Sequence, residues 1–189
     1  RDLIGATDIG IEIEAGQAFG TGHHGTTAGC LDMMARLFRR HVPNIILDVG
    51  TGSAVLAIAA AKRWKVPVIA TDIDPVATKV AKQNAALNGV GGLVHCLSAS
   101  GLSHNVVRGN GPYPLNVANN LAKPLMKLAP QFANNLSDGG DVILSGILAE
   151  QRYKVLAAFR QQGLYQQKTI WREGWVTLHL RADSPQWSG

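Results

Sequence analysis

The chain has 189 residues, of which 46% are hydrophobic and 16% charged, and its formal net charge is +5. This length favours one compact domain, and the hydrophobic fraction argues against a disordered chain. No apolar run approaches the roughly 20 residues needed to cross a bilayer. Two cysteines are too few for a disulfide scaffold and favour a reducing, cytoplasmic setting. Because the basic residues form no long run, we expect no stable nucleic-acid binding.

Apolar strand-like runs alternate with segments of helical period, a pattern typical of a parallel sheet wrapped by helices. The Asp-Pro and Asn-Gly pairs that bound the third helix are expected start and stop signals. In chain order, the pattern predicts an extended start at 9–13, a helix at 26–41, a strand at 45–49, a helix at 53–64, a strand at 68–71, a helix at 74–88, a strand at 93–97, a loop at 98–112, a strand at 115–118, a helix at 121–136, a strand at 141–147, a helix at 148–162 and a hairpin of 167–171 with 175–180.

The strongest local signal is a buried strand that runs into the turn Gly50-Thr51-Gly52 and then a helix. Glycines there let the backbone approach a ligand, and Asp72, at the end of the next strand, can accept hydrogen bonds from ribose hydroxyls. Together they indicate a nucleoside-containing cofactor. A dinucleotide would require a third glycine where Val55 stands, so a nucleoside without phosphates fits better. The alternative is that the glycines form only a tight turn and Asp72 caps the next helix.

A second signal is the glycine-rich block 18–27, in which residues 19–25 can fold over a ligand as a mobile lid. Thr26 or Thr27 can cap the helix that follows it. The neighbouring His23 and His24 have no cysteine or acid at ligand spacing, so we expect no metal.

A third signal is the strand that ends in Asn119-Asn120, where Asn119 could accept a hydrogen bond from an amine or simply form a turn. Ser145 lacks the flanking glycines of a nucleophile elbow, which disfavours a hydrolase. Trp171 and Trp175 are expected to pack at the core or the rim of the sheet.

These blocks, in this order, resemble the ribosomal protein L11 methyltransferase family, a group of class I S-adenosylmethionine-dependent protein methyltransferases. The resemblance covers essentially 9–181, and the block 18–27 is its most specific part. It implies a Rossmann-like α/β fold, with a seven-stranded, mostly parallel sheet, an antiparallel closing hairpin and helices on both faces. The other matching segments are 47–53, 71–75 with Asn84 and 88–90, 117–122 with 124–125, 139–140, 144–148 and 172–176.

The resemblance implies that S-adenosylmethionine is the cofactor and that Asn119 is the catalytic residue. The cofactor-contacting positions would be Phe19, Gly20, Thr21, Thr27, Gly50, Gly52, Asp72 and Asn119, the first three lying in the loop that closes over the methionine end. The acceptor would be amino groups, on lysine side chains or the N-terminus, of a ribosomal protein of the large subunit. The chain departs from the family's usual glycine at Ala54, from an aspartate near Pro114 and from an isoleucine at Asn120.

The expected organisation is an extended segment and lid at 1–25, a methyltransferase domain at 26–182 and a disordered tail at 183–189. The family's N-terminal domain, which recognises the ribosomal protein, is expected to be absent. We expect no membrane association, and the sequence does not indicate the oligomeric state. The alternatives are a methyltransferase for RNA or a small molecule, a non-catalytic S-adenosylmethionine-binding module and a nicotinamide oxidoreductase, which Val55 disfavours.

Overall fold

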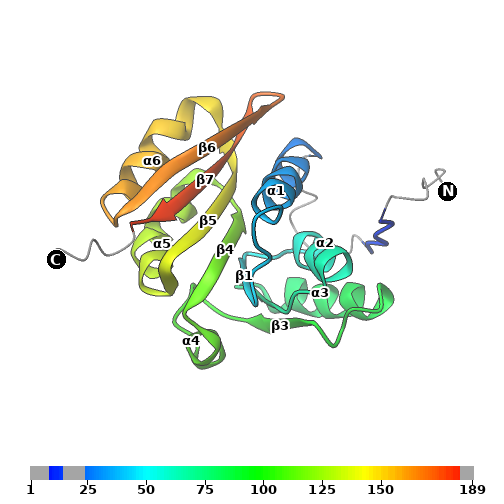
Figure 1. The fold of residues 1–189 in the computed structure, drawn as a ribbon. Coiled ribbons are helices and arrows are strands. Elements are labelled where there is room, and N and C mark those ends of the chain that lie inside the picture. The colour runs from blue at the N-terminus through cyan, green and yellow to red at the C-terminus, as the bar shows by residue number, and fades with distance from the viewer. Residues whose placement is uncertain (1–8, 15–23, 184–189) are drawn as a thin grey trace.

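A computed structural model describes residues 9–14 and 24–183 (Figure 1). Its strands form one sheet in the order β3-β2-β1-β4-β5-β7-β6. The first five strands are parallel, and β7 is antiparallel to both of its neighbours. This arrangement confirms the predicted fold class. The strands are β1 (Ile46–Val49), β2 (Val68–Asp72), β3 (Val94–Ser98), β4 (Tyr113–Asn119), β5 (Leu136–Leu148), β6 (Leu164–Arg172) and β7 (Trp175–Ala182).

Helices cover both faces of the sheet (Figure 1). One hydrophobic core joins the sheet to the first three helices, and a second core on the opposite face joins it to the other three. Residues that alternate along a strand feed the two cores, as Ile46 and Leu47 of β1 do. The helices are α1 (His24–Leu37), α2 (Val55–Trp64), α3 (Pro75–Leu87), α4 (Asn105–Asn110), α5 (Ala122–Asn134) and α6 (Arg152–Arg160), with a short 3₁₀ turn η1 (Ala149–Gln151) before α6.

Several element boundaries differ from the sequence prediction. The first helix was predicted at 26–41, but α1 begins two residues earlier and ends at Leu37. A short helix, α4, lies inside the predicted loop 98–112, because His104 accepts the hydrogen bond that caps it. The strand predicted at 141–147 begins earlier, where Leu136 pairs with Tyr113, and its register with β4 shifts before Asp141.

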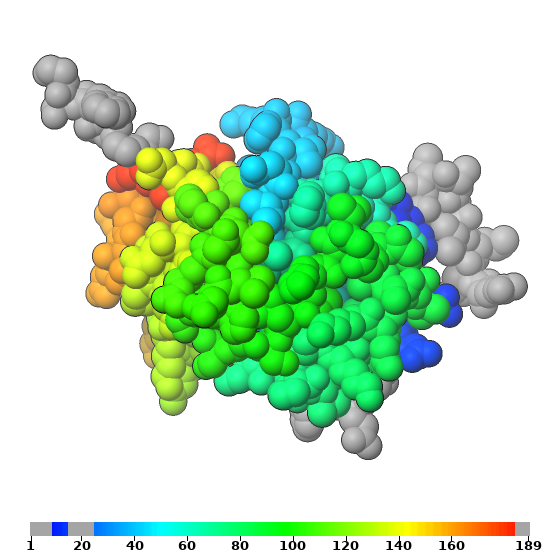
Figure 2. All heavy atoms as spheres, turned by 90° about the horizontal axis from the view of Figure 1, so that it is seen from below, coloured from blue at the N-terminus to red at the C-terminus, as the bar shows by residue number. Residues whose placement is uncertain are grey.

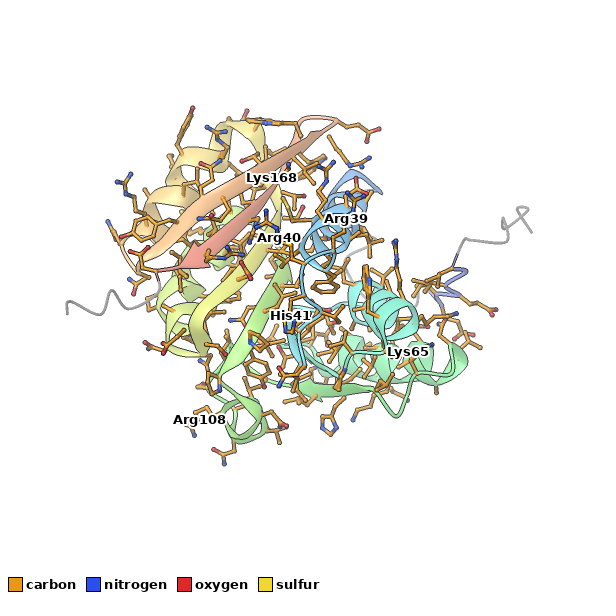
Figure 3. The ribbon with its side chains drawn as sticks, in the orientation of Figure 1. Arg39, Arg40, His41, Lys65, Arg108 and Lys168 are labelled. Atoms are coloured by element: carbon orange, nitrogen blue, oxygen red, sulfur yellow. The ribbon has the colours of Figure 1, made fainter. Side chains whose placement is uncertain are left out.

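The exposed basic side chains lie on different elements of the fold. Figure 3 labels Arg39, Arg40 and His41 just beyond the end of α1, Lys65 at the end of α2, Arg108 on α4 and Lys168 on β6. All six residues are exposed. None of the helices in the described part of the chain is long and apolar enough to cross a membrane.

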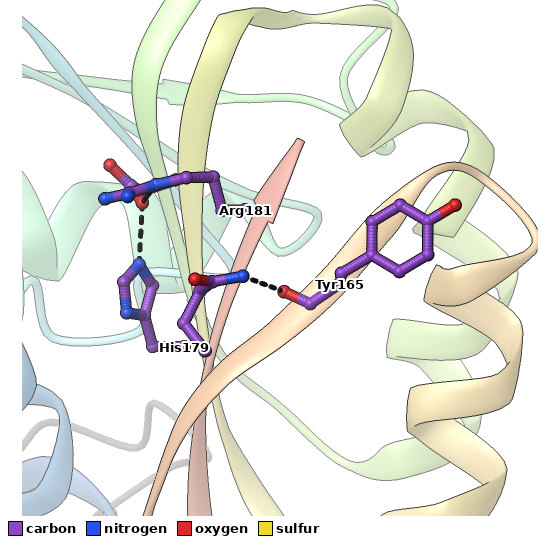
Figure 4. Close-up of polar contacts among 5 residues, drawn as sticks. Tyr165, His179 and Arg181 are labelled. Atoms are coloured by element: carbon purple, nitrogen blue, oxygen red, sulfur yellow. Dashed lines mark hydrogen bonds and ion pairs between the residues drawn. The ribbon is translucent and has the colours of Figure 1, made fainter. Parts of the chain in front are cut away.

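A polar cluster ties the closing hairpin to the parallel part of the sheet (Figure 4). Nε2 of His179 and Nε of Arg181, both on β7, lie 2.6 and 2.9 Å from one carboxylate oxygen of Asp141 on β5. Burial alone would raise the pKa of Asp141, but the hydrogen bonds from His179 and Arg181 hold it below its ordinary value. Asp141 therefore stays charged at neutral pH and pairs the two strands.

Candidate active site

Polar residues gather where the parallel strands end. The pairing places Val49 between Thr71 and Ala118, so the turn after β1 lies between the ends of β2 and β4. The same register places Asn119 beside Ser145. In open α/β sheets, ligands bind at this carboxyl edge. The edge is thus the candidate active site.

The turn after β1 has the backbone shape that its glycines predict. Gly50 and Gly52 have φ angles of +70° and +55°, in the left-handed region. The amide of Gly52 donates to Oδ2 of Asp72 at 2.9 Å, and the amide of Asp74 donates to Oδ1 at 3.0 Å. Among the described residues, nothing lies within 4 Å of the place where a Cβ on Gly52 would stand. The turn therefore presents open backbone next to a fixed carboxylate.

The helix-capping alternative for Asp72 was wrong, because its neighbour has that role. Asp74 is the N-cap of α3, and its side chain accepts a hydrogen bond from the amide of Val76 at 2.8 Å. Asp72 instead joins the glycine turn to the end of β2 and remains half-buried. An ionised carboxylate has about four acceptor sites, so two backbone donors leave room for ribose hydroxyls.

A buried carboxylate lies beneath the turn. Asp48 on β1 is only 2% exposed, and the hydroxyl of Thr51 donates to its Oδ2 at 2.6 Å. Burial raises the pKa of Asp48 to about 6, opposed by the hydrogen bond from Thr51 and reinforced by the charge of Asp72. Sequence reasoning missed this residue, although an acid within an apolar strand was a usable signal.

Asn119 belongs to a hydrogen-bond network that joins the sheet edge to α1. Its Nδ2 donates to Oγ1 of Thr26 at 3.3 Å. The hydroxyl of Ser145 donates to the carbonyl of Thr26 at 3.2 Å and lies 2.9 Å from the hydroxyl of Thr177. Gly29 allows this close packing, because a Cβ there would stand 2.2 Å from Oγ1 of Thr177. The network fixes the direction of the Asn119 amide.

Asn120 closes the other side of the turn. Its Nδ2 donates to the carbonyl of Val49 at 3.1 Å. A Cβ on Gly50 would lie only 2.2 Å from the same Nδ2 atom. Gly146, with φ of +82°, admits the backbone of Asn120, because a Cβ would come within 2.5 Å of the carbonyl oxygen. A side chain at either glycine would displace Asn120 or its backbone.

Four of the predicted cofactor positions come together at this edge: Gly50, Gly52, Asp72 and Asn119. Thr27 lies in α1, but the contact of this helix with Asn119 comes from the preceding residue, Thr26. The expectation that Thr26 or Thr27 caps this helix was wrong, because the helix begins at His24.

Other sequence expectations have different outcomes. Phe19, Gly20 and Thr21 lie outside the described residues, as do the ends 1–8 and 184–189. The last two residues of the predicted lid, His24 and Gly25, are described and form the start of α1. In the ranges 9–14 and 24–183, no group of three or more histidine, cysteine, aspartate or glutamate side chains could hold a metal. Sequence reasoning considered Ser145 only as a nucleophile and missed Thr177, whose partners lie far away in the chain.

The strand order, the glycine turn after β1 and the acid at the end of β2 define a class I methyltransferase fold. Solved methyltransferases share it: an RNA methyltransferase from Salinibacter ruber, in complex with S-adenosyl-L-homocysteine, is 18% identical with a TM-score of 0.66. The match covers 89% of this chain and 97% of that one, and at this identity it shows the fold alone.

A family model described as ribosomal protein L11 methyltransferase (PrmA) matches residues 3–183, and the chain belongs to this family. The ribosomal protein L11 methyltransferase of Rhizobium meliloti is 58% identical, over 95% of this chain and 62% of that relative. Its counterpart from Agrobacterium fabrum is 55% identical, over 97% of this chain and 63% of that relative. The ribosomal protein L11 methylase structure from Lactobacillus delbrueckii subsp. bulgaricus is 34% identical, with a TM-score of 0.82, and the match covers 92% of this chain and 85% of that one. The chain spans about three fifths of the length of these curated relatives.

Proposed function

We propose that this chain binds S-adenosylmethionine and transfers its methyl group to amino groups of ribosomal protein L11. The observation that carries the proposal is the meeting of the glycine turn, Asp72 and Asn119 at one edge of the sheet. The family supports the same activity, because the relatives are named for methylating this acceptor.

The residues present fit the cofactor. Asp72, already oriented by the amides of Gly52 and Asp74, would accept hydrogen bonds from the ribose hydroxyls. The open backbone at Gly52 would let the cofactor lie close to the turn. When bound, S-adenosylmethionine supplies a methyl group on a sulfonium. The contacts of Phe19, Gly20 and Thr21 with the methionine end, and the contact of Thr27 with the cofactor, stay predictions.

Asn119 would orient the acceptor amine. Methyl transfer to nitrogen is an in-line displacement, so alignment of a neutral nitrogen lone pair is the main requirement. A lysine must first lose its proton, from a reference pKa of about 10.4, and a desolvated site favours its neutral form. Because Nδ2 of Asn119 points to Thr26, its Oδ1 is the atom that would accept a hydrogen bond from an N–H of the neutral amine. The site therefore works without a strong base.

An exposed aromatic cluster at the same edge would receive the protein acceptor. The guanidinium of Arg152 lies 4.4 Å from the ring centroid of Tyr153 and 5.1 Å from that of Trp171. The two aromatic residues are 72% and 55% exposed, which places Trp171 at the rim of the sheet. Because α6 follows the carboxyl end of β5, the cluster lies at the same end of the strands as Asn119. Arginine, tyrosine and tryptophan are the side chains most enriched at protein interfaces.

Calorimetry and radiolabelled methyl transfer test the proposal together. We expect S-adenosylhomocysteine to bind this chain and NAD not to bind. We expect methyl transfer to ribosomal protein L11 to be slow, and faster when the remaining part of the relatives' length is attached, because remote binding energy positions the reacting amine. Binding of NAD in place of S-adenosylhomocysteine would refute the cofactor assignment. Label appearing in RNA rather than in the protein would refute the acceptor.

A further inference from the structure

Residues 9–14 lie extended beside α3, and two asparagine side chains bind their backbone. Oδ1 of Asn88 accepts from the amide of Glu12 at 3.0 Å, and its Nδ2 donates to the carbonyl of Glu12 at 2.7 Å. Asn84 makes the same pair with Glu14, at 3.0 and 3.4 Å. Figure 2 shows the segment in dark blue at the rim of the molecule, beside atoms coloured for α3. We call Asn84 and Asn88 the amide clamp.

The clamp works because a helix turn and an extended chain have nearly the same repeat. Asn84 and Asn88 stand four residues apart on α3, a rise of about 6 Å. Glu12 and Glu14 stand two residues apart, about 6.6 Å in an extended strand. A carboxamide also carries the same donor and acceptor as a peptide group. The helix thus substitutes for a neighbouring strand, while Ile11 and Ile13 pack against the core.

The clamp also reaches the cofactor turn. Nδ2 of Asn84 donates at 3.0 Å to the carbonyl of Ser53, the residue that directly follows Gly52. Asn84 is fully buried, and Nδ2 of Asn88 donates to its backbone carbonyl at 2.8 Å. One side chain therefore holds both the end of the N-terminal segment and the end of the glycine turn.

We propose that Asn84 and Asn88 are positioning residues, which couple docking of residues 9–14 to cofactor binding at the glycine turn. The inference rests on the proposed function. Neither residue needs to touch the cofactor, since Asn84 acts through Ser53. Coupling between two sites is reciprocal, so a ligand that fixes the turn also tightens the segment, and release of the segment weakens the ligand.

The test combines titration with S-adenosylhomocysteine and amide hydrogen exchange, for wild type, Asn84→Ala and Asn88→Ala. The matched control is Gln83→Ala, an exposed position on the same helix. Loss of the Asn84 amide is expected to weaken ligand binding about tenfold, the equivalent of one hydrogen bond, and loss of the Asn88 amide about threefold. Ligand is expected to slow exchange at the Glu12 and Glu14 amides in wild type and in the control, but not in Asn84→Ala.

A purely structural anchor would give a different result. The coupling is refuted if both variants bind S-adenosylhomocysteine as tightly as wild type. It is also refuted if the ligand does not change the rate of amide hydrogen exchange at Glu12 and Glu14 in wild type. If Asn84→Ala fails to fold, two measurements still test the coupling: the ligand affinity of Asn88→Ala, at a half-buried position, and the effect of ligand on hydrogen exchange in wild type. Absence of binding by wild type itself would refute the proposed function and this inference with it, whereas normal wild-type binding confines any failure to the clamp.

Discussion

Replacing Asp48 with asparagine is expected to change how stability depends on pH. The folded protein raises the pKa of Asp48 from its ordinary 3.8 to about 6, chiefly by burial. The folded state therefore holds this proton more tightly than the unfolded state does. The resulting stabilisation is complete below pH 3.8 and is lost as the pH rises through 6, because the native protein must then bury a charge.

The size of the effect follows from the two pKa values. A rise from 3.8 to about 6 corresponds to about 3 kcal/mol of unfolding free energy, as an order of magnitude. Asparagine keeps an acceptor for Thr51 but carries no charge. Relative to wild type, Asp48→Asn should gain about 3 kcal/mol in unfolding free energy between pH 4 and pH 8. Any cost of the new buried amide is independent of pH and cancels in this comparison.

Urea unfolding of both proteins across this pH range measures the difference directly. Ionisable groups that do not interact with Asp48 contribute equally in the two proteins, so their contributions also cancel. Asp138→Asn, at an exposed position, is the control and should show no such trend. A stability difference between wild type and Asp48→Asn that stays constant from pH 4 to pH 8 would refute the burial argument.

Three further substitutions separate binding, turnover and acceptor docking. Asp72→Ala should weaken S-adenosylhomocysteine binding by about 1.5 to 3 kcal/mol in calorimetry, whereas Asp74→Ala, which removes a helix cap, should mainly lower stability by about 1 kcal/mol. Asn119→Ala should reduce methyl transfer at saturating cofactor with little change in Tm. If the variant instead unfolds and its folded fraction turns over normally, Asn119 is only a turn residue. Trp171→Ala should raise KM for the protein acceptor without altering cofactor affinity. An unchanged KM would show that the exposed aromatic cluster does not bind the acceptor.

The parallel sheet and most of the site could be predicted because both depend on local patterns. A buried run followed by glycines identifies a strand end, and the ends of parallel strands meet at one edge. That rule alone places the glycine turn, Asp72 and Asn119 together, as the structure shows. The cap of α3 also followed from two adjacent residues, Asp74 and Pro75.

The remainder depended on contacts between distant segments. The hydrogen bond from Asn119 to Thr26 spans 93 residues, and that from Ser145 to the carbonyl of Thr26 spans 119. No local pattern reports such a pairing. The early start of β5 has a similar cause, because Leu136 pairs with Tyr113 of β4, and the register shifts before Asp141 pairs with Leu115. The amide clamp was equally hidden, since its asparagines bind backbone rather than a recognisable side chain.

Two departures from the family pattern lie at the backbone that shapes the turn. Ala54 has φ of +66°, a left-handed conformation that costs an alanine about 1 kcal/mol and that the glycine expected there from the resemblance would adopt freely. The strain is tolerated because Ala54 is fully buried and its amide bonds to the carbonyl of Thr51 at 2.9 Å. Asn120, in place of isoleucine, adds a hydrogen bond to Val49 on the opposite side. With both residues present, the backbone at Gly52 is open and its amide donates to the carboxylate of Asp72.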